Sequence, residues 1–400
     1  MRILDPLLFL TGHRGAIERI AATRHAWIVG AILVLSAGIA RNYDHLDLLR
    51  NPEWFIGPFA ASMVSIVFIF LWISGPLKLF KLGRGGPQFL AFLTFAWLTA
   101  PCAWIYGIPV ESMTDMVTAT KWNIAFLAIV SLWRVALMTR MVAVLTGVTH
   151  MRALPLILAP AALEMMVGSF FKSLSLIQIM GGVRLPPHTE LLQQASQFTT
   201  IASFWVFVVV IIQSIYYRSR PAFSPLSRPP APLPKSWIAL ASTALVLWAI
   251  AAVPFHPRIA NRDRLTSLID AKDYREAIEF ASARTRADFP PHHYLPPEPD
   301  GYRFPFELLE ALPADAPDWL RREWESSAID ALWFNLPYSS ERWEDMERRL
   351  PKITALMRAR ADEIRQARPR NSDEMDFLRR FDSITKPQAT KPSTPLSPEP

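Results

Sequence analysis

The chain has almost no cysteine. Cys102 is the single cysteine among 400 residues, so neither an intrachain disulfide nor a metal cluster held by several thiolates is possible. Any part of the protein outside a membrane must therefore be stabilised by its own hydrophobic core.

Signatures of catalysis and of ligand binding are also scarce. The glycine-rich turn at Gly83–Gly86 is not followed by the Lys-Ser/Thr pair of a phosphate-binding loop. His292 and His293 are adjacent and lack the i, i+4 spacing of a helical zinc site. No serine, cysteine or glutamate-histidine protease signature occurs. The sequence thus predicts no catalytic residue, no cofactor site and no metal site.

Four acidic residues leave one kind of enzyme site as a hypothesis. Asp44 and Asp47 are three residues apart, a spacing at which two carboxylates can share a divalent ion. Glu111 and Asp115 fall in the next loop expected on the same side of a membrane. If all four converged, they could serve an enzyme that modifies lipids.

Long apolar runs dominate the first 254 residues. A helix needs roughly 20 apolar residues to cross about 30 Å of hydrocarbon. Seven runs approach or reach that length, and the first is the shortest: Ala26 to Ala40, Phe55 to Ile73, Phe89 to Ile108, Trp122 to Val142, Ala153 to Phe171, Thr200 to Tyr217 and Trp237 to Val253. These runs predict an all-α polytopic transmembrane bundle of about seven spans, covering 26–254.

The distribution of Lys and Arg predicts the orientation of the spans. Alternate loops hold 13 basic residues on one side and 5 on the other, and the richer loops stay in the cytoplasm. The segment 1–25 is then cytoplasmic, and we expect it to be a solvated, partly helical lead-in. A cleavable signal is the competing interpretation, because the first run ends in Gly38-Ile39-Ala40, which has small residues where a peptidase would need them.

The net charge of +7 does not indicate nucleic-acid binding. The basic excess is spread over loops between apolar runs, whereas nucleic-acid binding needs a concentrated basic face. The bilayer is the partner that this pattern predicts.

The residues after the last run have a different composition. Amphipathic patterns predict a helical extramembrane domain over 255–385, which seven crossings put outside the cytoplasm. Its first helix carries Leu265, Leu268 and Ile269 behind a cap at Asn261 or Asp263, and a second carries Tyr274, Ala277, Ile278 and Ala281. Residues 268–278 resemble the turn and second helix of a single tetratricopeptide repeat; an ordinary helical hairpin is the alternative.

Later segments of this domain also have helical patterns. They lie near Phe306 to Leu312, Pro317 to Trp333, Ser340 to Leu350 and Ile353 to Arg368. Trp319, Trp324, Trp333, Phe334 and Trp343 can supply a core. The segment 386–400 is rich in proline, serine and threonine and is expected to be a disordered tail.

Two ionisable side chains stand out deep inside the apolar runs. Burying a charge in hydrocarbon costs about 2.5 to 3.5 kcal/mol or more, so Arg134 and Glu164 are the candidate functional residues. Their spans form a hairpin, and 1.5 Å of rise per residue puts the two side chains at similar depths. The sequence predicts that Arg134 and Glu164 form an intramembrane ion pair, either structural or part of a gate.

Three strings resemble a family of polytopic bacterial membrane proteins with no assigned activity. They are LTGHRGAIERI at 10–20, APCAWIYGIPVE at 100–111 and SLWRVALM at 131–138. The resemblance implies a bacterial cytoplasmic membrane and no catalytic residue.

These observations leave three functions. The first is a membrane-anchored interaction or scaffold protein that binds protein partners through its C-terminal domain. The second is a small-solute permease or channel using Arg134 and Glu164, although no inverted repeat is visible. The third is the lipid-modifying enzyme described above.

Overall fold

The fold is helical throughout the part of the chain that the structure describes. The computed structural model describes residues 3–40, 52–74, 88–110, 113–173, 187–216, 229–290, 295–297, 305–335, 343–367 and 372–385. These residues contain no strand; their one isolated β-bridge joins Thr23 to Ala231. The all-α class is therefore confirmed.

The chain divides into two compact units. The N-terminal unit comprises Met1–Ala260 and Pro290–His293, and the C-terminal unit comprises Asn261–Phe289 and Tyr294–Pro400. We describe each unit by itself.

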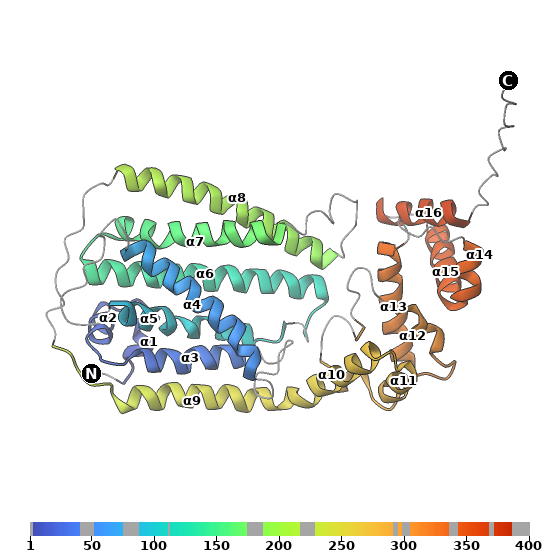
Figure 1. The fold of residues 1–400 in the computed structure, drawn as a ribbon, viewed down its shortest axis with the longest axis horizontal. Coiled ribbons are helices and arrows are strands. Elements are labelled where there is room, and N and C mark those ends of the chain that lie inside the picture. The colour runs from blue at the N-terminus through green and yellow to red at the C-terminus, as the bar shows by residue number, and fades with distance from the viewer. Residues whose placement is uncertain are drawn as a thin grey trace, which may run out of the picture. The chain divides into compact units, whose positions relative to one another are not determined.

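Long helices build the N-terminal unit (Figure 1). Its elements are α1 (Asp5–Phe9), α2 (Arg14–Ala21), α3 (Trp27–Ala40), η1 (Pro52–Phe55), α4 (Ile56–Ser74), α5 (Gln88–Leu98), η2 (Ala100–Gly107), α6 (Met116–Thr146), α7 (His150–Ser173), α8 (Pro187–Tyr216), α9 (Lys235–Ala252) and η5 (Val253–Phe255).

Among the residues that the structure describes, five stretches are long and apolar enough to cross a membrane. They correspond to α5 with η2, and to α6, α7, α8 and the stretch that begins at Lys235. The apolar helices Trp27–Ala40 and Phe59–Ile73 are shorter. Pro101 lies at the start of η2, where it ends the α-helical part of the third run, whereas α7 continues through Pro155 and Pro160.

Neighbouring helices of the unit pack closely. Helix α3 contacts α5, η2 and α9, and α7 contacts α4, α6 and α8. Gly30 makes the crossing of α3 and α5 possible, since a Cβ there would lie 2.8 Å from the Cβ of Trp97. At the far end of α3, a Cβ on Gly107 would lie 2.4 Å from the Trp248 ring.

The N-terminal segment is not the solvated lead-in that we expected. Helices α1 and α2 place Phe9, Ala16, Ile17 and Ile20 in the core, each at most 1% exposed. The spacing of these residues gives α2 an apolar face, and α2 packs against α6. Burial of this face, rather than solvation, determines the structure of residues 3–25.

Backbone hydrogen bonds join the N-terminal segment to the start of the last long helix. The Arg24 amide donates to the Ala231 carbonyl at 2.9 Å, and the Ala231 amide donates to the Ala22 carbonyl at 2.8 Å. The end of α2 and the beginning of α9 therefore lie at one end of the unit.

The C-terminal unit is a helical body with its own core. It contains α10 (His256–Asp270) from Asn261 onward, α11 (Tyr274–Ser282), η6 (Arg286–Asp288), α12 (Phe306–Ala311), α13 (Asp318–Asn335), α14 (Trp343–Arg349), α15 (Pro351–Ala367) and α16 (Ser372–Thr385). Helix α15 contacts α12, α13, α14 and α16. Trp324 is fully buried, and its Nε1 donates to the Pro296 carbonyl at 2.9 Å.

The first hairpin of this unit agrees with the sequence pattern in its core and differs at its start. Six of the expected residues are buried, namely Leu265, Leu268, Ile269, Ala277, Ile278 and Ala281, and Tyr274 is partly buried against them. The cap expected at Asn261 or Asp263 is wrong, because α10 begins at His256. Asn261 instead donates from Nδ2 to the Asp288 carbonyl at 2.9 Å. Residues 386–400 lie outside the described part of the chain.

Candidate functional site

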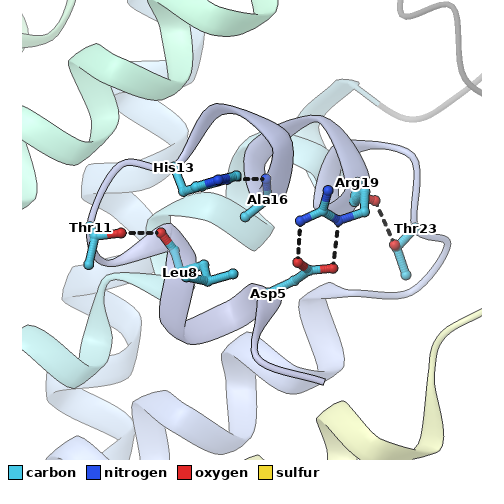
Figure 2. Close-up of polar contacts among 7 residues, drawn as sticks. All are labelled: Asp5, Leu8, Thr11, His13, Ala16, Arg19 and Thr23. Atoms are coloured by element: carbon cyan, nitrogen blue, oxygen red, sulfur yellow. Dashed lines mark hydrogen bonds and ion pairs between the residues drawn. The ribbon is translucent and has the colours of Figure 1, made fainter. Parts of the chain in front are cut away.

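A buried ion pair holds the α1–α2 hairpin together. Arg19 donates from Nε to Asp5 Oδ2 at 2.8 Å and from Nη2 to Asp5 Oδ1 at 2.5 Å (Figure 2). The Asp5 side chain is fully buried, and a carboxylate in that position requires such a partner. The hydrogen bond from Arg19 to Asp5 raises the pKa of the guanidinium above its usual value.

Local hydrogen bonds fix the two helix ends of this hairpin. His13 caps α2 by accepting from the Ala16 amide through Nδ1 at 3.2 Å, and Thr11 donates to the Leu8 carbonyl at 2.8 Å (Figure 2). Gly12 adopts a φ of 71°, a left-handed conformation that suits glycine.

The hairpin is attached to α6 by two side chains one heptad apart. Trp133 donates from Nε1 to the Leu10 carbonyl at 2.9 Å, and Arg140 donates from Nε to the Gly12 carbonyl at 3.2 Å. Positions i and i+7 share a helix face, so α6 presents both donors to the same loop. The basic Arg140 therefore lies at the end of the unit that also carries α1 and α2.

Arg134 follows Trp133 on α6 and faces a different neighbour. Its Nε donates to Thr99 Oγ1 at 3.0 Å, between α5 and η2. Thr99 is buried, and its hydroxyl proton is committed to the Ala96 carbonyl at 2.6 Å. Cys102 and Tyr106 on η2 interact electrostatically with Arg134. Arg134 as a residue is exposed, although its hydrogen bond to Thr99 is partly buried.

Glu164 on α7 has a hydroxyl partner on another helix. Ser65 of α4 donates to Glu164 Oε2 at 2.7 Å. The other oxygen, Oε1, is buried and has no hydrogen-bond partner among the described residues.

The structure does not bring Arg134 and Glu164 together. Within the described part of the chain, Arg134 bonds to Thr99 and Glu164 to Ser65, and no ion pair joins them. The expected pairing rested on depth alone. Successive residues of a helix point in directions about 100° apart. Two side chains at the same depth on different helices can therefore face different neighbours.

The other carboxylates considered above do not form a described cluster. Asp115 is the N-cap of α6 and accepts from the Thr118 amide at 3.0 Å. That hydrogen bonding lowers the Asp115 pKa. Asp44, Asp47 and Glu111 lie outside the described residues, as do Gly83–Gly86 and the pair His292 and His293. No group of three metal-ligating side chains occurs among the residues that are described.

At Trp133 and Arg134, α6 contacts two other segments of the chain. The loop at Leu10 contacts α6 through Trp133, and the α5–η2 junction contacts α6 through Arg134. Sequence reasoning identified Arg134 and Glu164 but missed Ser65 and Thr99, because hydroxyl residues are common in apolar helices and bond their own backbone there. Comparison of the chain with protein-family models, curated proteins and solved structures gives no match.

Proposed function

We propose that this chain is a seven-span protein of the bacterial cytoplasmic membrane that presents an extracytoplasmic helical unit to protein partners. In this proposal α3 and α4 cross the membrane in addition to the five longer apolar stretches, which gives seven spans. The N-terminus lies in the cytoplasm, and an odd number of crossings puts the C-terminal unit on the opposite side.

The exposure of the most apolar helices is the observation that carries this proposal. Only 6% of the apolar window of α8 is buried inside the protein. Its Ile201, Trp205, Val209 and Ile212 are 58 to 61% exposed and recur every three or four residues. A soluble protein buries such a stripe, whereas a membrane protein turns it toward lipid.

The basic residues support the orientation. The α1–α2 hairpin, the end of α6 and the beginning of α9 share one end of the N-terminal unit. Arg14, Arg19, Arg24, Arg140 and Lys235 belong to these elements or their flanks. A common cytoplasmic face would give all five a favourable position.

The C-terminal unit supports an interaction role because its core is self-contained. Leu265, Leu308, Leu320, Trp324 and Ile353 are fully buried within that unit. A body that packs on its own can remain folded while its surface binds a partner.

Two experiments test the proposal. Alkaline phosphatase fused after Arg368 should be active, and activity from a cytoplasm-only reporter at that position would contradict the orientation. Co-purification from native membranes should recover proteins with the full chain that are lost from a chain ending before Asn261. Recovery of the same proteins with both chains would contradict the interaction role.

A permease or channel is the second candidate. The observation that favours it is the unfilled hydrogen-bonding capacity of Arg134 and Glu164 in apolar helices. Solute uptake into proteoliposomes that is abolished by Glu164→Gln, with membrane insertion retained, would favour this function over a scaffold.

A further inference from the structure

The guanidinium of Arg134 has hydrogen-bonding capacity that the protein does not use. A guanidinium carries five N–H donors. Among the described residues, Thr99 is its only hydrogen-bond partner, and it takes the Nε donor. The end of the guanidinium that carries Nη1 and Nη2 is left for another acceptor.

Thr99 also fixes the direction of that end. Because its hydroxyl proton bonds to the Ala96 carbonyl, its oxygen is an acceptor toward Arg134. Nε is therefore held against α5, and the planar group presents its two outer nitrogens side by side. Two parallel N–H donors match the two oxygens of a phosphate or a carboxylate.

The surroundings of Arg134 are apolar and accessible. Leu127 and Ser131, seven and three residues earlier on α6, share the face of Arg134, and both are exposed. Leu127 is 49% exposed. A ligand reaching the guanidinium from this side would meet mainly hydrocarbon.

We propose that Arg134 binds the oxyanion of a membrane amphiphile, a phosphate or carboxylate whose apolar chain lies against the exposed part of α6. The proposal rests on the membrane insertion proposed above. It assigns the ligand to the class that combines a two-oxygen anion with a hydrocarbon chain. An exposed arginine in hydrocarbon needs such a counter-ion, since a lone charge there is costly.

The test uses the full chain in nanodiscs of zwitterionic lipid. Three probes are titrated: dodecyl phosphate, inorganic phosphate and the neutral detergent dodecyl maltoside. Empty nanodiscs give the partitioning background. Saturable binding of dodecyl phosphate at least about tenfold tighter than that of the other two probes is the expected result, because the anion and the chain both contribute.

Variants then locate the site. Arg134→Gln should weaken dodecyl phosphate binding about tenfold or more, because it removes the charge-assisted pair. Lys121→Gln is the matched control, since it removes one positive charge from the outer end of the same helix and should leave binding unchanged. Equal binding by Arg134→Gln and the wild-type protein would overturn the proposal.

The remaining outcomes are also decisive. Inorganic phosphate binding as tightly as dodecyl phosphate would mean a free-anion site and overturn the amphiphile assignment. If Arg134→Gln does not accumulate, binding of the three probes to the wild-type protein still tests the proposal. Extraction of the wild-type protein by alkaline carbonate would instead contradict membrane insertion, which separates failure of the proposed function from failure of this inference.

Discussion

At the scale of single residues, Gly30 sets how closely α3 and α5 approach. A Cβ at this position would lie 2.8 Å from the Cβ of Trp97. At that distance the two atoms clash, so α3 or α5 would have to move. Gly30→Ala should therefore lower the stability of the N-terminal unit by about 1 to 3 kcal/mol. The thermal unfolding midpoint of the full chain in nanodiscs measures the effect.

Gly168 provides the matched control for this substitution. It also lies inside a long helix, α7, but a Cβ there would meet no atom within 4 Å. Gly168→Ala should leave stability unchanged or raise it by up to about 1 kcal/mol, because alanine favours the helix. Equal losses from both substitutions would show that close packing is not the cause.

The buried pair of Asp5 and Arg19 gives a second prediction at this scale. Asp5→Asn removes the charge that pairs with Arg19 and should lower the free energy of opening the α1–α2 hairpin by about 2 to 4 kcal/mol. Hydrogen exchange of the α2 amides reports that free energy. Arg14→Gln breaks the exposed Arg14–Glu18 pair on the same helix and should cost no more than about 0.5 kcal/mol. Similar effects of both variants would contradict a special role for the buried pair.

The candidate site was only partly predictable from sequence. Charge within an apolar run identifies Arg134 and Glu164, because few residue types are so costly in hydrocarbon. The partners Thr99 and Ser65 carry no comparable signal. Asp5 looked like an ordinary acidic residue near the N-terminus, and nothing in its neighbours showed that Arg19 would enclose it.

At the scale of elements, α13 carries a pH-dependent contribution to stability. Burial raises the pKa of Glu325, and nearby Arg321 opposes the shift. The folded state then binds a proton more tightly than the unfolded state, so stability falls as the pH rises from the unfolded pKa through the folded one. Glu325→Gln should stabilise α13 relative to the wild type at pH 7 and have little effect below pH of about 4.

Hydrogen exchange of the α13 amides in the full chain, at both pH values, measures this difference. Glu323→Gln serves as the comparison, because Glu323 forms an ion pair with Arg286 at 2.9 Å. Loss of this ion pair in Glu323→Gln should destabilise α13 or leave its stability unchanged, and it should not stabilise the helix. A gain from Glu323→Gln equal to that from Glu325→Gln would indicate a general charge effect on the helix.

Most helices of the C-terminal unit were predicted closely, and one was missed. The expected segments near Phe306 to Leu312 and Ile353 to Arg368 correspond to α12 and α15. Helix α16 was missed although Phe377 and Phe381 lie one helical turn apart and are both buried. Helix α8 begins at Pro187, well before the apolar run at Thr200, since hydrophobicity marks membrane depth rather than helix ends.

At the scale of the whole molecule, the exposed apolar stripe on α8 yields a direct prediction of contact with lipid. A nitroxide attached by Trp205→Cys, in a Cys102→Ala background, should collide often with oxygen and rarely with a water-soluble nickel complex. Oxygen concentrates in hydrocarbon, and the nickel complex stays in water. Frequent collisions with nickel would mean that this face of α8 contacts water.

Val210 supplies the internal control for the stripe. It lies on the same helix but is only 4% exposed. A nitroxide attached by Val210→Cys should collide rarely with both reagents. High oxygen accessibility at both positions would mean that α8 does not pack against its neighbours in the membrane.

The packing of α3 against α9 has a consequence for biosynthesis. Helix α3 has 14 residues and rises about 21 Å, less than the hydrocarbon thickness of about 30 Å. Helix α9 follows after roughly 200 residues, so a ribosome adding about 5 to 20 residues per second needs about 10 to 40 s to supply it. Under the topology proposed above, one side of this short helix stays uncovered throughout that interval. Completion of the packing around α3 is then tied to the synthesis of α9, which is made much later.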